Sequence, residues 1–188
     1  YTHCHADHVH GLDDLRVFSA PRRRLLPVHA PADCAETLRR RFDYVFDPDV
    51  QPLEGTSKPE AALSVFRGFE PMTAAGFALL PLPVPHGAGQ AYGFRCGALG
   101  YVTDAKELPP RVFEALRGVR VLVLNALWFG RPHPTHFTVE EAVAVAERLG
   151  AEVTYLTHLS HRVGHAELEA RLPPAVRPAY DGLVVTIP

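Results

Sequence analysis

The chain opens with Tyr1-Thr2-His3-Cys4-His5-Ala6-Asp7-His8, which places three imidazoles and one carboxylate within six consecutive residues. Imidazole nitrogens and carboxylate oxygens are the usual protein ligands of zinc, and they also suit manganese and iron. In an extended chain, His3, His5 and Asp7 point to one side, and His8 can turn from the following bend towards a second ion. The alternative interpretation, an exposed tag-like cluster of histidines, does not account for the interleaved aspartate.

Length and composition are those of an ordinary globular protein. The chain has 188 residues, 47% of them hydrophobic and 21% charged, which predicts a single domain over residues 1–188 with one buried core. The net charge of −2 supplies no field that would attract nucleic acid or anionic lipid. Two arginine triplets, at residues 22–24 and 39–41, are interpreted as solvated surface. No run of about 18 apolar residues is present, so no membrane-spanning helix is expected.

The cysteines and the first residue lead to two further predictions. Cys4, Cys34 and Cys96 are odd in number and widely spaced, which predicts no disulfide scaffold and a reducing, cytoplasmic location. Cys4 itself is interpreted as a small buried filler between ligands. The chain starts on Tyr1, without the strand that should support the histidine motif, so we expect the domain to be N-terminally incomplete.

Helical and extended patterns alternate along the chain. The clearest helix signal is Thr138-Val139-Glu140-Glu141, a capping box followed by an apolar stripe and ended by Gly150. Gly97-Ala98 is expected to join two strands as a hairpin. This alternation predicts an α/β fold. The expected helices are 31–45, 109–116, 138–149 and 165–172, and the expected strands are 25–29, 77–85, 91–96, 99–103, 119–124, 153–157 and 183–187.

Three later residues with metal-binding side chains each follow an expected strand. They are His86, Asp104 and His158. Functional groups gather at the carboxyl ends of strands in open α/β sheets. Any one of them alone would be interpreted as an ordinary loop residue, but with the opening motif they complete a set of seven ligands. Seven ligands suit two ions that share one bridging carboxylate.

The order HxHxDH, then His, Asp and His, resembles the metallo-β-lactamase superfamily. The resemblance implies an α/β fold of the metallo-β-lactamase type, an αββα sandwich. It also implies a division of the ligands between two ions, with one carboxylate shared. His3, His5 and His86 would hold one ion, Asp7, His8 and His158 the other, and Asp104 would bridge them.

Four stretches resemble the PhnP-type phosphodiesterases within this superfamily: residues 2–16, 131–136, 157–161 and 179–182. By that resemblance His136 acts in catalysis, and Asp7 helps to orient the nucleophile as well as binding metal. His133 is either an ordinary loop residue or a support for His136. His161 would join upstream cysteines at a separate structural zinc. From the residues alone, His136 and His161 also fit as a polar loop residue and a solvent-facing histidine.

The resemblance implies a dinuclear metal-dependent phosphoric diester hydrolase. The expected cofactors are two divalent ions, zinc or manganese and alternatively iron, with a third, structural zinc if the cysteines exist. The expected substrate is a small cyclic phosphodiester such as 5-phosphoribosyl 1,2-cyclic phosphate. An imidazole at His136 would protonate the departing alkoxide, a task suited to a group that titrates near neutral pH.

Three other functions remain open on the same fold. They are a tRNA 3′-end processing endonuclease, a lactonase- or glyoxalase-type hydrolase, and a non-catalytic cofactor-pathway protein similar to PqqB. The endonuclease needs an RNA-gripping arm and a basic face; neither is present in residues 1–188, and an arm upstream of residue 1 stays open. The expected partner is therefore a small phosphodiester rather than nucleic acid or a membrane, and a homodimer is compatible with the sequence.

Overall fold

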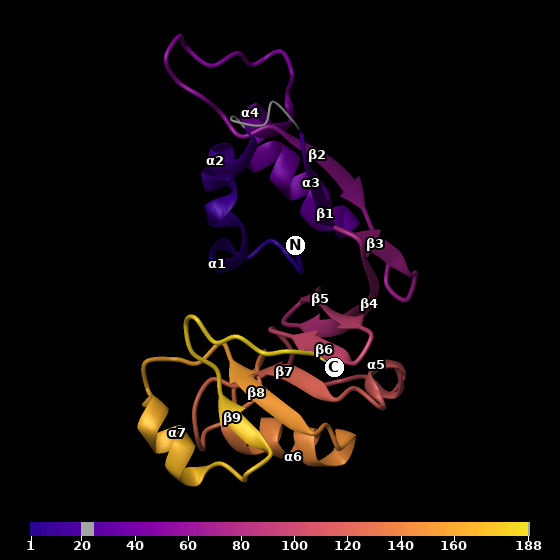
Figure 1. Ribbon diagram of the computed structural model, residues 1–188, viewed down its shortest axis with the longest axis vertical. Helices are drawn as coiled ribbons and strands as arrows, with labels where there is room; N and C mark the ends of the chain where they lie inside the picture. Colours follow the sequence, from indigo (N-terminus) through magenta and orange to yellow (C-terminus); the bar gives the residue numbers. More distant parts are fainter. Residues whose placement is uncertain (20–24, 188) are drawn as a thin grey trace. The chain divides into compact units, whose positions relative to one another are not determined.

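The structure is a computed structural model that describes residues 1–19 and 25–187. The chain divides into two compact units, Tyr1–Arg67 and Gly68–Pro188, drawn in indigo to magenta and in magenta to yellow (Figure 1). The arginine triplet at 22–24 lies outside the described residues. Among the described residues, no helix is long and apolar enough to cross a membrane.

The first unit packs short helices against a two-stranded parallel sheet. The strands β1 (Leu26–Ala30) and β2 (Ala61–Val65) pair in parallel, from Leu26 opposite Ala61 to Ala30 opposite Val65. Buried apolar side chains such as Leu12, Val28 and Leu38 form its core. The helices are α1 (Ala6–Val9), the 3-10 helix η1 (His10–Leu15), α2 (Arg16–Ser19), α3 (Ala32–Arg41) and α4 (Asp43–Phe46).

Two local expectations for the first unit are wrong. The helix expected over 31–45 is interrupted at Phe42, where φ is −129° and ψ is 45°. The Asp43 carboxylate accepts a hydrogen bond from the Tyr44 amide at 2.8 Å, and such a side-chain bond competes with the helical ladder. The opening motif is also not extended throughout, because α1 begins at Ala6. Asp7 and His8 therefore leave the alternation that His3 and His5 follow.

The expectation that the cysteines form no disulfide is also wrong, because the structure contains one between Cys4 and Cys34, with their Cα atoms 5.2 Å apart. The two residues are separated by 30 positions in sequence, and sequence spacing alone does not reveal which cysteines the fold brings together. Cys96 is a free thiol. Cys4 is therefore bonded to the first turn of α3 rather than being only a filler between ligands.

The second unit is a seven-stranded mixed sheet in the order β3-β4-β5-β6-β7-β8-β9. Pairing is antiparallel from β3 to β6 and parallel from β6 to β9. The strands are β3 (Met72–Ala74), β4 (Phe77–His86), β5 (Gly89–Cys96), β6 (Leu99–Val102), β7 (Val121–Asn125), β8 (Val153–Thr157) and β9 (Val176–Pro178).

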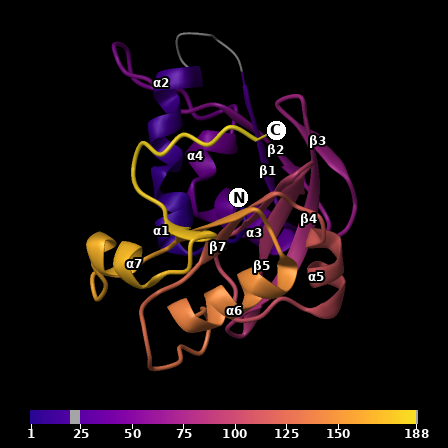
Figure 2. The same ribbon diagram turned by 60° about the horizontal axis from the view of Figure 1, so that its bottom comes forward.

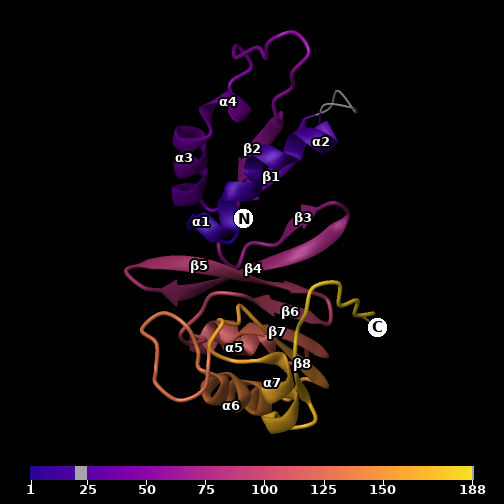
Figure 3. The same cartoon turned by 90° about the vertical axis from the view of Figure 1, so that its left-hand side faces the viewer.

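One helix lies in each connection between the parallel strands of this unit. Each crossover advances the sheet in the same direction, and right-handed crossovers then put every helix on the same face. All three helices do lie on one face of the sheet (Figure 2, Figure 3). They are α5 (Pro110–Leu116), α6 (Val139–Leu149) and α7 (His165–Arg171).

Most of the element expectations for this unit are confirmed. The hairpin turns at Gly97-Ala98 between β5 and β6. The Thr138 hydroxyl accepts from the Glu141 amide, the Glu141 carboxylate accepts from the Thr138 amide, and Gly150 ends α6 with φ at 69°. Gly93 is required by packing, because a Cβ there would lie 2.7 Å from a Val102 methyl group and 2.9 Å from the Tyr101 carbonyl oxygen.

The strand expected over 183–187 is wrong, and the last strand is β9. Residues 183–187 belong to no helix or strand, and Val184 is 88% exposed. Alternating apolar residues form a strand only where a neighbour accepts their backbone hydrogen bonds, and β9 has that neighbour in β8. The prolines around β9 hid it in the sequence, but a proline is tolerated at a sheet edge.

Candidate metal centre

In the first unit, the histidines of the opening motif converge. His3 and His5 lie in the extended segment before α1, and the Nε2 atom of His3 is 2.9 Å from the Nδ1 atom of His5. The ring centroids of His3 and His8 are 4.3 Å apart. At the start of α1, the Nε2 atom of His8 lies 3.3 Å from an Asp7 carboxylate oxygen. The four metal-binding side chains of the motif are therefore grouped as the sequence predicts, although by an extended segment followed by a helical turn.

In the second unit, Asp104 is the centre of the cluster. Its Oδ1 atom lies 3.2 Å from the Nε2 atom of His136 and 3.2 Å from the Nε2 atom of His158. The ring centroids of His86 and His136 are 4.8 Å apart, and those of His136 and His158 are 4.7 Å apart. Three imidazoles thus surround a carboxylate that is only 3% exposed. A buried carboxylate is costly unless cations or hydrogen-bond donors compensate it.

The secondary structure explains why these side chains meet. His86 is the last residue of β4, Asp104 is the second residue after β6, and His158 comes directly after β8. Because β6, β7 and β8 are parallel, the loops after β6 and β8 emerge at the same edge of the sheet. The backbone of His158 has φ at 57°, a left-handed conformation that costs a non-glycine residue energy and is concentrated at functional sites.

The loop before α6 carries His136 in a network of hydrogen bonds. The Thr135 hydroxyl lies 2.8 Å from the Nδ1 atom of His136 and 3.2 Å from the Nδ1 atom of His133. The Thr135 carbonyl oxygen lies 3.3 Å from the Nδ1 atom of His86. Burial lowers the pKa of His133, and the neighbouring His136 and Lys106 lower it further. His133 thus contacts the same threonine as His136, which fits a supporting role.

Two residues at this site were not singled out from the sequence. Thr135 connects His86, His133 and His136, and only its position between two histidines hinted at that role. Asn125, fully buried at the end of β7, accepts a hydrogen bond from the Ala105 amide at 2.9 Å and so holds the backbone next to Asp104. The available signal was a polar residue that ends an otherwise apolar strand.

The donor set fits divalent metal ions. In the second unit, ligand atoms of His86, Asp104 and His136 all lie within 4.8 Å of one another. In the first unit, the donors of the opening motif meet in two pairs, His3 with His5 and Asp7 with His8. Clusters of imidazole and carboxylate, without thiolate, suit zinc, manganese and iron. His161 lies in an exposed turn between β8 and α7, and its role at a structural zinc stays a prediction.

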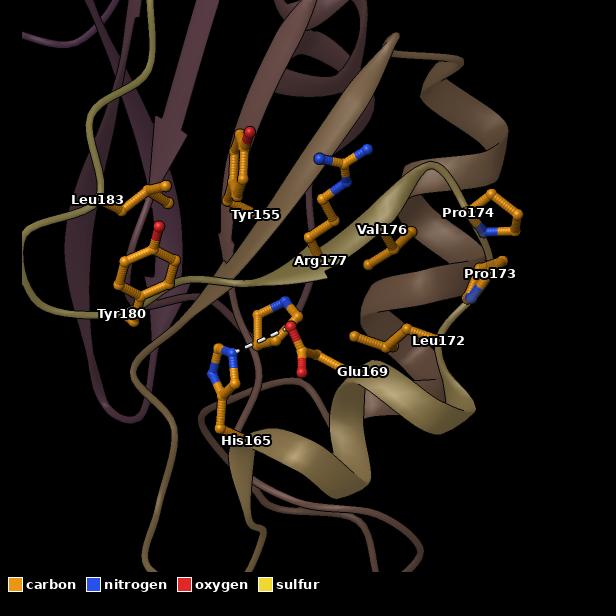
Figure 4. A pocket seen from close by; sticks show the side chains of 11 residues that line it. Tyr155, His165, Glu169, Leu172, Pro173, Pro174, Val176, Arg177, Tyr180 and Leu183 are labelled. Carbon is orange, nitrogen blue, oxygen red and sulfur yellow. Dashed lines mark ion pairs between the residues drawn. The ribbon is translucent and has the colours of Figure 1, made fainter.

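A separate cavity of about 380 Å³ lies beside β8, β9 and α7 (Figure 4). Tyr155, Arg177 and Tyr180 contribute polar groups to its wall, together with the ion pair between His165 and Glu169, 3.3 Å apart. None of the metal-binding residues predicted from the sequence lines it. The cavity is therefore not part of the metal cluster.

Comparison with known proteins gives a family match and similar proteins. The model of the beta-lactamase superfamily domain matches residues 1–159. An octanoyltransferase of Porphyromonas gingivalis is 35% identical over 187 residues, which are 99% of this chain and 37% of that protein. This chain therefore spans little more than a third of the length of that relative.

Two solved structures are informative. One, described as a new diphosphatase from the PhnP family, is 36% identical with a TM-score of 0.85, and the match covers 97% of this chain and 68% of that chain. Zinc-bound PqqB from Methylobacterium extorquens is 16% identical with a TM-score of 0.70, covering 97% of this chain and 70% of that chain, and shows a likeness of fold alone. The family match over residues 1–159, with the 36%-identical solved relative, shows that this chain belongs to the metallo-β-lactamase superfamily and has its α/β fold.

Proposed function

We propose that this chain is a metal-dependent phosphodiesterase that hydrolyses a small cyclic phosphodiester such as 5-phosphoribosyl 1,2-cyclic phosphate. The observation that carries the proposal is the 3.2 Å contact between the Nε2 atom of His136 and the carboxylate of Asp104. It places an imidazole that can supply a proton beside the residue expected to bridge two ions. The 36% identity to a PhnP-family diphosphatase supports phosphorus as the centre attacked.

The proposed cofactors are two divalent ions, zinc or manganese, held by the seven predicted ligands. When bound, such ions make a water molecule nucleophilic near neutral pH and neutralise charge on the phosphate oxygens. The proposed ligands are His3, His5, Asp7, His8, His86, Asp104 and His158.

The chain's own contribution to the chemistry is a histidine, His136, positioned to donate a proton. In the doubly protonated imidazolium form of His136, the Nδ1–H donates to the Thr135 hydroxyl oxygen across 2.8 Å. The Nε2–H, on the nitrogen that faces Asp104, is then the proton that the ring can give up, and the ring becomes a neutral imidazole when it does so. A sugar alkoxide is a poor leaving group unless it is protonated as it departs. Transfer of the Nε2 proton to that oxygen would be general acid catalysis, which contributes about 10²–10⁴-fold to a rate.

A second candidate substrate is a diphosphate, because the solved relative is named a diphosphatase. Hydrolysis of a diphosphate linkage expels a phosphate, which is a far better leaving group than an alkoxide. The two candidates therefore differ in how much they need the proton of His136, and one variant can distinguish them.

The test is to measure turnover and metal content of His136→Ala. Because His136 is not one of the seven proposed ligands, we expect the variant to keep both ions and to lose about 10²–10⁴-fold in kcat on the cyclic phosphodiester. The loss on bis(p-nitrophenyl) phosphate should be much smaller, because nitrophenolate leaves without a proton. The exposed residue His10 supplies the control, and His10→Ala should leave both rates unchanged.

Two outcomes would contradict the proposal. Equal losses on both substrates would show that His136 positions substrate or metal instead of donating a proton. A wild-type protein that hydrolyses a dinucleoside diphosphate at a higher kcat/KM than the cyclic phosphodiester would replace the proposed substrate with the second candidate.

A further inference from the structure

The segment that carries His3 and His5 is tied to helix α3 through the residue between them. Cys4 is joined by the disulfide to Cys34, which lies in the first turn of α3. The carbonyl oxygen of Cys4 also accepts a hydrogen bond from the Arg41 guanidinium, at the last residue of α3, at 3.3 Å. Residues 1–5 belong to no helix or strand, so these contacts with α3 restrain the backbone of the two histidines.

The two sulfur atoms differ in their surroundings. Cys34 is 1% exposed and belongs to the apolar core of the first unit, whereas Cys4 is only half-buried. The Cys4 side is therefore the more accessible side of the bond, and the side from which a small thiol would attack. Accessible disulfides are the ones that exchange readily, while buried ones are inert.

The reduced state has a ready arrangement as well. The Sγ atom of Cys4 lies 3.2 Å from the carbonyl oxygen of Cys34, so a Cys4 thiol can donate to that oxygen. After reduction the two sulfur atoms move apart from bonding distance, and the Cys34 carbonyl oxygen offers a Cys4 thiol an acceptor close to its position in the disulfide state.

From these contacts we infer that Cys4 and Cys34 form a reversible dithiol–disulfide modification site that controls how firmly His3 and His5 are held for metal binding. In the disulfide state, residue 4 is covalently fixed to α3 and the imidazoles on either side are preorganised. In the dithiol state, hydrogen bonds alone hold the segment. The effect on metal binding rests on the proposed metal centre, but the existence of the modification does not.

The chemistry balances with a monothiol such as glutathione as co-reactant. The sulfur of one glutathione attacks the Sγ atom of Cys4, the S–S bond breaks, and Cys34 leaves as a thiolate and takes up a proton. A second glutathione attacks the mixed disulfide, which releases the Cys4 thiol and one molecule of glutathione disulfide. Two electrons and two protons pass to the protein, and oxidation by glutathione disulfide is the reverse. A compartment that keeps thiols reduced would hold the dithiol state until an oxidant appears.

The first measurement counts thiols in the full chain after treatment with glutathione or with glutathione disulfide, followed by denaturation and alkylation. The structure predicts three alkylated cysteines after reduction and one, Cys96, after oxidation, with a peptide that links Cys4 to Cys34. Cys34→Ala should show no oxidant-dependent link, whereas the matched control Cys96→Ser should behave as the wild type. Three free thiols after oxidation, or a link that involves Cys96, would overturn the proposal.

The second measurement compares zinc affinity and thermal stability in the two states. Because partners that orient metal ligands are worth about 10–100-fold in affinity, the dithiol state should bind zinc at least about 10-fold more weakly in competition with a chelator. Its melting temperature should be about 5–15 °C lower. Cys34→Ala should match the dithiol state under both conditions.

Equal zinc affinity in the disulfide and dithiol states would overturn the proposal that the Cys4–Cys34 bond controls metal binding. Absence of zinc binding in both states would instead contradict the proposed metal centre, and the thiol count would still decide the modification. The two failures are therefore distinguishable.

Discussion

Asp104 is the residue on which the cluster of the second unit depends. Its carboxylate contacts His136 and His158 with the same oxygen atom, and the buried Asn125 holds the backbone that follows it. In the proposed centre Asp104 would serve two ions at once, and none of the other proposed ligands would replace it. Its removal should therefore be more damaging than removal of any single histidine.

We expect Asp104→Ala to lose bound metal and at least about 10²-fold in turnover, since metal ligation and charge neutralisation depend on it. Elemental analysis should find close to two ions per chain in the wild type and markedly fewer in the variant. The exposed Asp181 supplies a control, and Asp181→Ala should keep the wild-type metal content. A wild type with almost no transition metal under metal-replete conditions would refute the assignment of all seven ligands.

The prediction for His161 tests the structural zinc by itself. If the native chain carries the expected cysteines, His161→Ala in that chain should lose one zinc per chain and melt at a lower temperature, because structural zinc contributes directly to folding. Zinc analysis and calorimetry provide the measurement. An unchanged zinc content and melting temperature would show that His161 is a solvent-facing turn residue.

Among the secondary-structure elements, α6 matters for both stability and the site, because the interactions that cap it also restrain His136. Its first turn is tied to the loop after β6, because the Lys106 ammonium lies 2.7 Å from both carboxylate oxygens of Glu141. Glu141 also accepts from the Thr138 amide at 2.8 Å. His136 is two residues ahead of this cap, so the interactions that begin the helix also limit the freedom of the histidine.

The pKa of Glu141 predicts how the stability of the protein depends on pH. Burial opposes its ionisation, but hydrogen bonds from Lys106 and the Thr138 amide outweigh burial and lower the pKa of Glu141 below its ordinary value of 4.5. A lowered pKa in the folded state stabilises the protein above pH 4.5, and this contribution is lost as the pH falls through the folded pKa.

Thermal melts between pH 3 and 7 should show this dependence in the difference between wild type and Glu141→Gln. The variant should melt about 2–4 °C lower at pH 7, a loss of no more than about 1 kcal/mol because the side chain is more than a third exposed. The difference in melting temperature between wild type and Glu141→Gln should become smaller below pH 4.5. A gap that stays constant with pH would mean that the charge of Glu141 contributes nothing.

For the whole molecule, metal binding should be linked to stability. A ligand that binds only the folded state stabilises it, by about 2.7 kcal/mol at a free concentration of 100 times Kd. One zinc ion at that concentration should therefore raise the melting temperature by about 5–11 °C. Calorimetry with buffered free zinc, and with EDTA, provides the measurement. Asp104→Ala should show a much smaller rise, and an equal rise would place the stabilising zinc elsewhere.

The fold could largely be predicted from the sequence because its signals are local. The capping box at Thr138 and the glycine at 150 mark α6, and the residues at the ends of β4, β6 and β8 stand out because apolar strands end in polar side chains. The grouping of Asp104 with His158 follows from the parallel order of those strands. These features depend on residue spacing and side-chain chemistry, both of which can be identified in the amino-acid sequence.

What the sequence determined by itself is the class of the protein: an α/β chain of the metallo-β-lactamase superfamily with a histidine and aspartate ligand set. What only the tertiary structure decided are pairings between segments distant in sequence. Cys4 meets Cys34, and Thr135 meets His86. Residues 183–187 form no strand, while the proline-flanked β9 pairs with β8. Local pattern sets which conformations a segment prefers, but a disulfide, a hydrogen bond between loops or a strand requires a partner, and only the folded chain supplies one.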